Sequence, residues 1–208
     1  MFLLCALILT MVFWIEFRQK IIVWTAITFS VLLFMSISLD RIQDFRKEEL
    51  IVFSIRNSSA IAYSKGSKCI VLADFDPADR TFSYSIWPAL ESRGGSDITL
   101  LSIDSTVRTD SYWSDSNFMQ FGKFRVLRWD RKISLPKSYE KIEVDILVLS
   151  NNPVHKLADI NTFIEFKKIL IDPTNSDYKI KAWLSETAKM NLSTYVLKKS
   201  PAYIINLK

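Results

Sequence analysis

The stretch Val144–Trp183, VDILVLSNNPVHKLADINTFIEFKKILIDPTNSDYKIKAW, decides the fold. Its first six residues form an apolar run, interrupted only by Asp145, that is typical of a buried strand, and residues 168–171 form a second strand that ends at Asp172-Pro173. A segment with helical spacing of its apolar side chains follows each strand. The first helix presents Leu157, Ile160, Phe163 and Ile164; the second, capped by Asn175 or Ser176, presents Ile180, Trp183, Leu184 and Thr187. This order predicts an α/β domain.

Antiparallel strands are predicted upstream of this unit. Short apolar or alternating runs occur at residues 50–55, 61–63, 68–73, 98–103, 118–121 and 123–129. Glycines at the turns Lys65-Gly66-Ser67 and Gly122 favour two hairpins.

A helical segment begins near Pro77 with Phe82, Ile86 and Leu90 on one face, and Pro88 should kink or split it. Residues 106–116 are polar and predict a loop. Residues 194–197 and 202–207 predict a closing two-strand unit around Ser200-Pro201. The expected domain is a mixed α/β sheet with helices on its faces, over residues 50–208.

The front of the chain has a different character. From Met1 to Leu39 only Glu16, Arg18 and Lys20 are charged. The run Ile21–Leu39 has no charge, and at about 1.5 Å rise per residue it approaches the ~30 Å hydrocarbon core of a bilayer. The shorter run Met1–Ile15 is marginal for a span. The two runs predict a transmembrane helical hairpin over residues 1–39, and residues 40–49 predict a charged linker. Basic residues on the two sides nearly balance, so the positive-inside rule leaves the orientation open.

Composition excludes several classes of protein. The 208 residues are 49% hydrophobic and 13% aromatic, which excludes a disordered chain. Two cysteines, Cys5 and Cys69, cannot build a disulfide scaffold. His155 is the single histidine, so a His-rich zinc site and a histidine-based triad are not expected, and no G-x-S-x-G motif is present. The sequence therefore indicates no metal, no cofactor and no enzymatic activity.

Polar residues at strand ends are the remaining candidates for chemistry. Residues 151–155 follow the strand 144–149 as a polar loop, a position where α/β proteins often place sites. Asp74, Asp76 and Asp172 also follow strands, where carboxylates serve as acid–base groups or metal ligands. The same residues equally suit turns and helix caps beside Pro77 and Pro173. Both interpretations stay open at this point.

The net charge of +5 permits contact with an anionic partner. The densest basic stretch is residues 122–141, and it predicts either a sequence-independent phosphate track with aromatic stacking or a solvated strand edge protected by cations. The candidate contacts are Lys123, Arg125, Arg128, Arg131 and Lys132, with Trp129 as a stacking surface. In an extended strand Lys123 and Arg125 share one face, whereas Arg128 has the opposite parity and needs a bulge or a strand end to join them.

The sequence resembles a known family. The pieces that carry the resemblance are LIVFSIRNSSAIAYSKGSKCIVLAD at residues 50–74, LVLSNNP at 147–153, ILIDPTNSDYKIKAW at 169–183 and PAYII at 201–205. They resemble the C-terminal part of ComEC-type competence proteins, the inner-membrane channels for single-stranded DNA uptake. The branch it resembles most ends in a reduced metallo-β-lactamase-like domain.

This resemblance implies an integral protein of the inner membrane with its C-terminal domain on the periplasmic side. Its partners would be the membrane, single-stranded DNA and an upstream channel-forming segment. Catalytic relatives carry an H-x-H-x-D-H cluster that this sequence lacks, which implies a non-catalytic, degenerate domain without metal ligands. A degenerate nuclease-type hydrolase and a membrane-tethered interaction domain without a nucleic-acid role are the alternatives.

Overall fold

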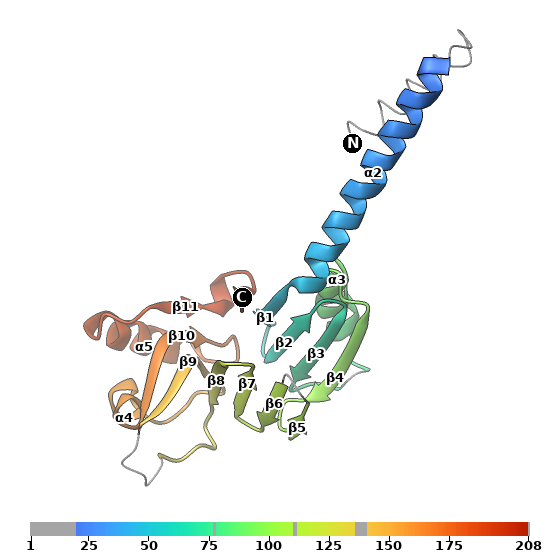
Figure 1. The fold of residues 1–208 in the computed structure, drawn as a ribbon. Helices are drawn as coiled ribbons and strands as arrows, with labels where there is room; N and C mark the ends of the chain where they lie inside the picture. Colours follow the sequence, from blue (N-terminus) through green and yellow to red (C-terminus); the bar gives the residue numbers. More distant parts are fainter. Residues whose placement is uncertain (1–19, 77, 110–111, 136–140, 208) are drawn as a thin grey trace. The chain divides into compact units, whose positions relative to one another are not determined.

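The computed structural model describes residues 20–76, 78–109, 112–135 and 141–207 (Figure 1). The chain divides into two compact units, residues 1–46 and residues 47–208, and each is described by itself.

The first unit contains helix α2 (Lys20–Arg46), a single helix of 27 residues. It includes the predicted span Ile21–Leu39 and continues into the predicted charged linker. Several large apolar side chains of α2 are between 47% and 71% exposed: Trp24, Ile27, Val31, Leu32, Phe34, Met35 and Ile37. Among the helices that the structure describes, none has both the length and the apolar content that crossing a membrane requires. The predicted span Met1–Ile15 lies outside the described residues.

The second unit is built on two mixed β-sheets. The five-stranded sheet has the order β12 (Tyr203–Asn206), β1 (Glu48–Val52), β2 (Ala60–Lys65), β3 (Lys68–Ala73), β4 (Asp97–Ser102). The seven-stranded sheet has the order β11 (Thr194–Val196), β10 (Ile164–Ile171), β9 (Ile142–Leu149), β8 (Phe124–Trp129), β7 (Phe118–Phe121), β6 (Tyr112–Asp115), β5 (Val107–Arg108). In the first sheet only β3 and β4 are parallel; in the second, β8 to β11 are parallel and β5 to β8 antiparallel.

Alternation along the strands divides the apolar side chains into layers. On β1, Leu50 and Val52 pack between the two sheets, whereas Ile51 packs outward against Ile86 and Leu90. These last two come from the short π-helix η1 (Phe82–Ile86) and from α3 (Trp87–Glu91). The outer side of the seven-stranded sheet is packed in the same way against α4 (Leu157–Phe163) and α5 (Asp177–Lys189). Helices thus lie outside both sheets, and the predicted mixed α/β class is confirmed.

Several local predictions agree with the structure. The hairpins β2–β3 and β7–β8 form where they were expected, with Gly66 and Gly122 at positive φ in their turns. The helix that was expected to break near Pro88 consists of η1 and α3, and Pro88 lies in the first turn of α3. The side chain of Ser176 caps α5 by accepting a hydrogen bond from Lys179 N.

Other local predictions were wrong. Residues 106–116 are not a loop but contain β5 and β6, where buried Tyr112 and Ser114 alternate with exposed neighbours. Residues 194–197 and 202–207 do not pair with each other, because β11 lies beside β10 while β12 lies beside β1. Ile164 begins β10 instead of ending a helix, and Leu184 is exposed on α5.

Candidate functional site

Polar residues gather where the parallel strands end. Asp74 follows β3, Asp104 follows β4, Asp130 follows β8, and Asp172 follows β10. Contacts between residues of the two sheets show that these ends lie together: Arg128 of β8 pairs with Asp104, and Asp74 raises the pKa of Asp172. We call this group, together with the loop after β9, the strand-end cluster.

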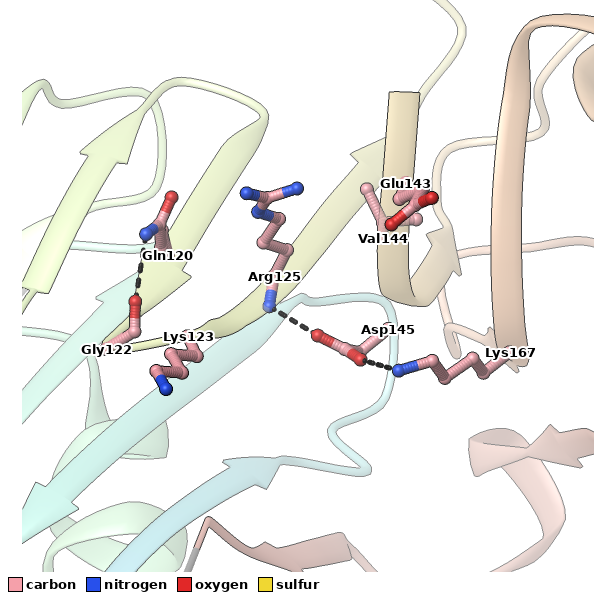
Figure 2. A pocket seen from close by; sticks show the side chains of 8 residues that line it. All are labelled: Gln120, Gly122, Lys123, Arg125, Glu143, Val144, Asp145 and Lys167. Atoms are coloured by element: carbon pink, nitrogen blue, oxygen red, sulfur yellow. Dashed lines mark hydrogen bonds and ion pairs between the residues drawn. The ribbon is translucent and has the colours of Figure 1, made fainter. Parts of the chain in front are cut away.

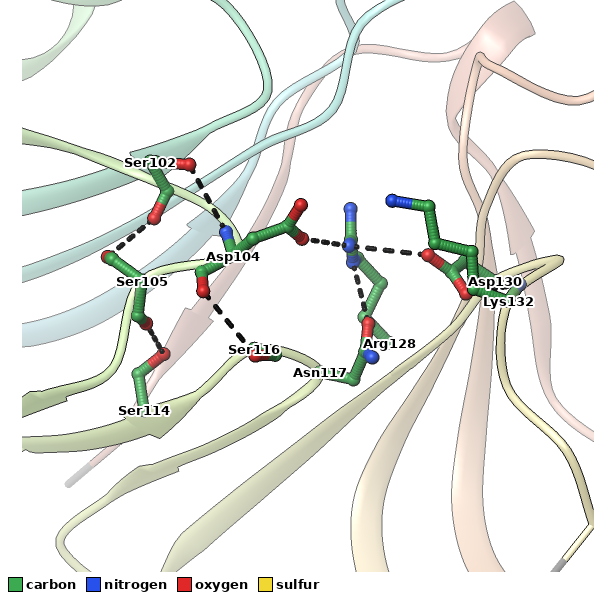
Figure 3. A network of polar contacts seen from close by, with 9 residues as sticks. All are labelled: Ser102, Asp104, Ser105, Ser114, Ser116, Asn117, Arg128, Asp130 and Lys132. Carbon is green, nitrogen blue, oxygen red and sulfur yellow. Dashed lines mark hydrogen bonds and ion pairs between the residues drawn. The ribbon is translucent and has the colours of Figure 1, made fainter.

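Arg128 is the cation of the strand-end cluster (Figure 3). It is 3% exposed, and its Nη2 lies 2.9 Å from Asp104 Oδ1 and 3.5 Å from Asp130 Oδ2. Its Nε donates to Asn117 Oδ1 at 3.3 Å. Asp130 is equally buried and also accepts a hydrogen bond from the backbone N–H of Lys132 at 2.8 Å. Because its guanidinium is bonded to Asp104, Asp130 and Asn117, Arg128 links the end of β8 to the loop after β4 and to the turn before β7.

Asp172 is a buried carboxyl in the same cluster. Its Oδ1 accepts hydrogen bonds from the backbone N–H and the hydroxyl of Thr174, at 2.8 and 2.6 Å, while its Oδ2 and the buried Ser59 hydroxyl have no hydrogen-bond partner of ordinary geometry. Burial raises the pKa of Asp172 above its ordinary value; the Thr174 and Ser59 hydroxyls oppose that rise, and Asp74 adds to it. Partial desolvation also raises the pKa of the more exposed Asp74. The cluster therefore holds carboxyls that favour a proton more than free carboxyls do.

Reciprocal hydrogen bonds join the loop after β9 to the loop after β10. Asn151 N donates to Thr174 Oγ1 at 2.9 Å, and Asn152 N donates to Asn175 Oδ1 at 2.8 Å. In return, Ser176 N donates to Asn152 Oδ1 at 2.8 Å. Asn151 and Asn152 both have positive φ, a conformation that asparagine tolerates better than most residues. Of the two interpretations left open for these residues, the observed hydrogen bonds are those of turns and of a helix start.

The chemistry available to the strand-end cluster is narrow. Within the described residues, no group of three or more His, Cys, Asp or Glu side chains is placed to hold a metal ion. The ring of His155 lies edge-on to Trp129 with 5.9 Å between centroids, and its Nδ1 is buried without a partner. The half-buried imidazole thus packs edge-on against Trp129.

Two of the predicted DNA contacts were wrong. Trp129 is 2% exposed and packs with the apolar side chains beneath α4 and α5, so it offers no stacking surface. Arg128 is buried and ion-paired, as described above. The other four candidates, Lys123, Arg125, Arg131 and Lys132, are exposed. Their binding to DNA stays a prediction.

The exposed candidates do not form one track. Arg125 lies near the start of β8, whereas Arg131 and Lys132 follow its end. At ~3.3 Å per residue the strand from Arg125 to Trp129 alone spans about 13 Å, and Arg131 lies beyond that end. Lys123 and Arg125 thus form one basic pair and Arg131 and Lys132 form another, at opposite ends of the strand.

A pocket of about 370 Å³ lies beside the first pair (Figure 2). Asp145 at its side accepts hydrogen bonds from Arg125 N at 2.8 Å and from Lys167 Nζ at 2.7 Å. The β9–β10 ladder pairs the residues before and after Asp145 and Lys167 but skips these two. Val144 accordingly packs on the helix side and Ile146 between the sheets, although they are two residues apart. At this local break in the alternation, the Asp145 carboxylate lies between β8 and β10 and accepts hydrogen bonds from a residue of each strand.

Sequence reasoning missed Asp104, Asn117 and Lys167. Each acts through a partner that is distant along the chain, and no local pattern identifies such a partner. The sequence did indicate in part that Arg128 is buried. In an extended strand its even position places it on the face opposite to Lys123 and Arg125.

Comparison with known proteins identifies the family. The model of the ComEC C-terminal domain matches residues 50–207, so the chain belongs to this family. No curated protein matches the chain. Among solved structures, it is similar to the metallo-beta-lactamase fold protein YhfI from Bacillus subtilis, with 8% identity, a TM-score of 0.42, and coverage of 77% of this chain and 99% of that one.

We expect Arg128→Met to lower the free energy of unfolding by about 3 kcal/mol, because it leaves the buried Asp130 carboxylate without its cation. The measurement is denaturant unfolding of the full chain in detergent, followed by tryptophan fluorescence. Adding Asp130→Asn should recover part of the loss. Arg125→Met, an exposed control on the same strand, should change stability by less than about 0.5 kcal/mol. Equal losses from the two methionine variants would contradict the pairing.

The buried Asp172 predicts a pH dependence of stability. Its folded-state pKa is raised, so the folded chain holds a proton that the unfolded chain releases above the ordinary carboxyl pKa near 4. Its contribution to stability is therefore present at low pH and decreases as pH rises toward the folded-state pKa. Asp172→Asn should accordingly be more stable than the wild type at pH 7, with the difference shrinking toward pH 4.

Asp177→Asn is the control, because the stability contribution of Asp177 has the opposite pH dependence. The Lys198 side chain, 3.0 Å away, lowers the pKa of Asp177, so this carboxylate contributes stability above the unfolded-state pKa and loses it in acid. Unfolding curves at pH 4 to 7 test both variants. A stability difference for Asp172→Asn that is independent of pH would show that its carboxyl is not perturbed.

Proposed function

We propose that this chain is a non-catalytic part of a membrane channel that takes up single-stranded DNA during natural competence. The observation that carries the proposal is the ComEC C-terminal domain match over residues 50–207. Within this proposal the two-sheet domain is a reduced metallo-β-lactamase-like domain whose site has lost its metal ligands.

The hydrogen bonds and ion pairs within the strand-end cluster support a non-catalytic role. Asp130 is paired with Arg128 and accepts a backbone N–H, and Oδ1 of Asp172 accepts two hydrogen bonds from Thr174. These contacts hold strand ends and loops in place. A hydrolytic site would need carboxylates or imidazoles that face a substrate, and His155 packs against Trp129 instead.

The exposed cations support weak binding of DNA. Lys123 and Arg125 lie beside an open pocket, and no carboxylate neutralises the Arg125 side chain among the described residues. Contacts of this type bind phosphates without reading bases. A nuclease-type hydrolase and an interaction domain without a nucleic-acid role are the competing functions, and the assay below separates them.

Association with the inner membrane is part of the same proposal. Family membership supports it, and so do the exposed apolar side chains of α2, because a surface of this kind needs a partner that removes it from water. We propose that lipid and the upstream channel-forming segment are those partners, with the two-sheet domain on the periplasmic side.

The DNA role predicts salt-sensitive binding without cleavage. Fluorescence anisotropy of a labelled oligothymidylate with the full chain in detergent should show affinity that falls with salt. With two to four phosphates contacted, the log–log slope is about −1.5 to −3, at ~0.7 per phosphate. Lys123→Ala/Arg125→Ala should weaken binding, and Arg131→Ala/Lys132→Ala serves as the matched pair at the other end of β8.

Each competing function gives a different result. Cleavage of the oligonucleotide in the presence of Mg²⁺, Mn²⁺ or Zn²⁺ would favour the nuclease-type hydrolase. Absence of binding at 50 mM salt would favour the interaction domain.

Membrane association predicts that the full chain stays in the pellet when membranes are washed with alkaline carbonate and is released by detergent. An alkaline phosphatase fused after Lys208 should be active, because that enzyme needs export to the periplasm. Release of the chain by carbonate alone would contradict membrane insertion. A fusion that is inactive, while a cytoplasmic reporter at the same position is active, would place the domain on the other side.

A further inference from the structure

Four side chains form a row across β5, β6, β7 and β8. The antiparallel register pairs Arg108 with Trp113, Trp113 with Gln120, and Gln120 with Arg125. Residues directly opposite each other in an antiparallel ladder project from the same face of the sheet. The register therefore places these four side chains side by side on one face, and we call them the cross-strand row.

This face points away from the core. The neighbours of the row along each strand, Val107, Tyr112, Phe121 and Val126 among them, pack between the two sheets. Arg108, Trp113 and Arg125 are exposed and Gln120 is half-buried. Helices α4 and α5 pack on the other part of this sheet, where Leu147 and Ile169 share one buried apolar cluster with Ile160 and Trp183. The helices therefore leave the cross-strand row accessible.

Trp113 is held in position while its indole stays 37% exposed. Its ring packs against that of Phe118, with 5.5 Å between centroids and 52° between planes. A tryptophan fixed on one side and open on the other loses little conformational freedom when a second ring stacks on it. Aromatic side chains placed in this way bind the bases of single strands without selecting among them.

The charges around Trp113 suit an anionic strand. Arg108 lies on the neighbouring strand and Arg125 two strands away on the other side, at about 5 and 10 Å by the usual strand spacing. The row ends at the pocket whose charged lining consists of the cations Lys123, Arg125 and Lys167 and the carboxylates Glu143 and Asp145. The carboxylate of Asp145 in that pocket is paired with Lys167 at 2.7 Å, which reduces its repulsion of a phosphate.

We propose that the cross-strand row is a platform for single-stranded nucleic acid, on which one base stacks on Trp113 while Arg108 and Arg125 bind the flanking phosphates. This inference rests on the proposed DNA role and assigns it a face and a stacking residue. The Gln120 amide lies between Trp113 and Arg125, where it can bond to a base edge or a sugar. The Lys123 side chain and the pocket receive the next phosphate along the strand.

The test compares base-bearing and abasic strands. The full chain in detergent is titrated into a labelled oligothymidylate and into a labelled abasic phosphodiester strand of the same length. The wild type should bind the base-bearing strand about tenfold more tightly, from a stacking gain of 1–3 kcal/mol. Trp113→Leu, which keeps apolar contact with Phe118, should lose this preference, and Trp113→Phe should keep most of it.

Trp87→Leu is the matched control. Trp87 is 40% exposed, close to the value for Trp113, but lies on α3 outside the five-stranded sheet. Its replacement should leave both affinities unchanged. Arg108→Ala and Arg125→Ala should weaken binding of both strands alike and each reduce the salt slope by about 0.7. Polyglutamate should compete poorly with oligothymidylate, because it has charge but no rings.

The outcomes separate the platform from the DNA role. If Trp113→Leu keeps the wild-type preference while Lys123→Ala/Arg125→Ala weakens binding, the platform is wrong and the proposed function stands. Effective competition by polyglutamate would likewise overturn stacking, since it would identify an acidic peptide as an equal ligand. If the wild type binds neither strand, the proposed DNA role fails and the platform fails with it.

Discussion

The packing of aromatic rings between the two sheets is the contact on which the rest of the structure depends. Tyr63 of β2 lies 4.9 Å from Phe121 of β7, and Phe121 lies 5.0 Å from Tyr112 of β6, measured between ring centroids. Burial raises the pKa of Tyr112 to about 12, as expected for a phenol kept in an apolar layer. Once these faces are joined, the ends of strands from both sheets meet. Arg128 then reaches Asp104, in the turn that follows β4 of the other sheet.

The alternation that builds this core also fixes what each outer face can do. On β8, Phe124, Val126 and Arg128 project toward the other sheet, and Arg125 and Leu127 project outward. Outward residues near β9 and β10 are covered by α4 and α5. The outward residues of the cross-strand row on β5 to β8 are exposed or half-buried, so β8 contributes both to the core and to this row. The basic and aromatic side chains of that row therefore occupy the outward positions that normal strand alternation provides.

This division explains how much the sequence could predict. Turn glycines and apolar runs identify the β2–β3 and β7–β8 hairpins and the unit β9–α4–β10–α5, because those signals are local. They do not reveal that β11 and β12 belong to different sheets, since that depends on pairing across the whole domain. For the same reason Trp129 resembles a surface aromatic in the sequence, although helices more than 25 residues away in the chain bury it. The polar composition of residues 106–116 predicts a loop and so hides Trp113, although its alternation with Tyr112 and Ser114 is a strand signal.

The two ends of β8 differ in charge, and this difference favours one of them for contact with DNA. The strand-end cluster contains Asp74, Asp104, Asp130 and Asp172, with Arg128 as its buried cation. Arg131 and Lys132 directly follow Asp130, whose carboxylate accepts a hydrogen bond from Lys132 N. Arg125 is about 13 Å from Trp129, the last residue of β8, at ~3.3 Å per residue. Since the Debye length is about 8 Å at physiological salt, repulsion from the cluster is largely screened at the other end. Under the proposed DNA role, we therefore expect an anionic strand to bind at Lys123, Arg125 and the row that contains Trp113, where Lys167 pairs with Asp145, more readily than at the strand ends.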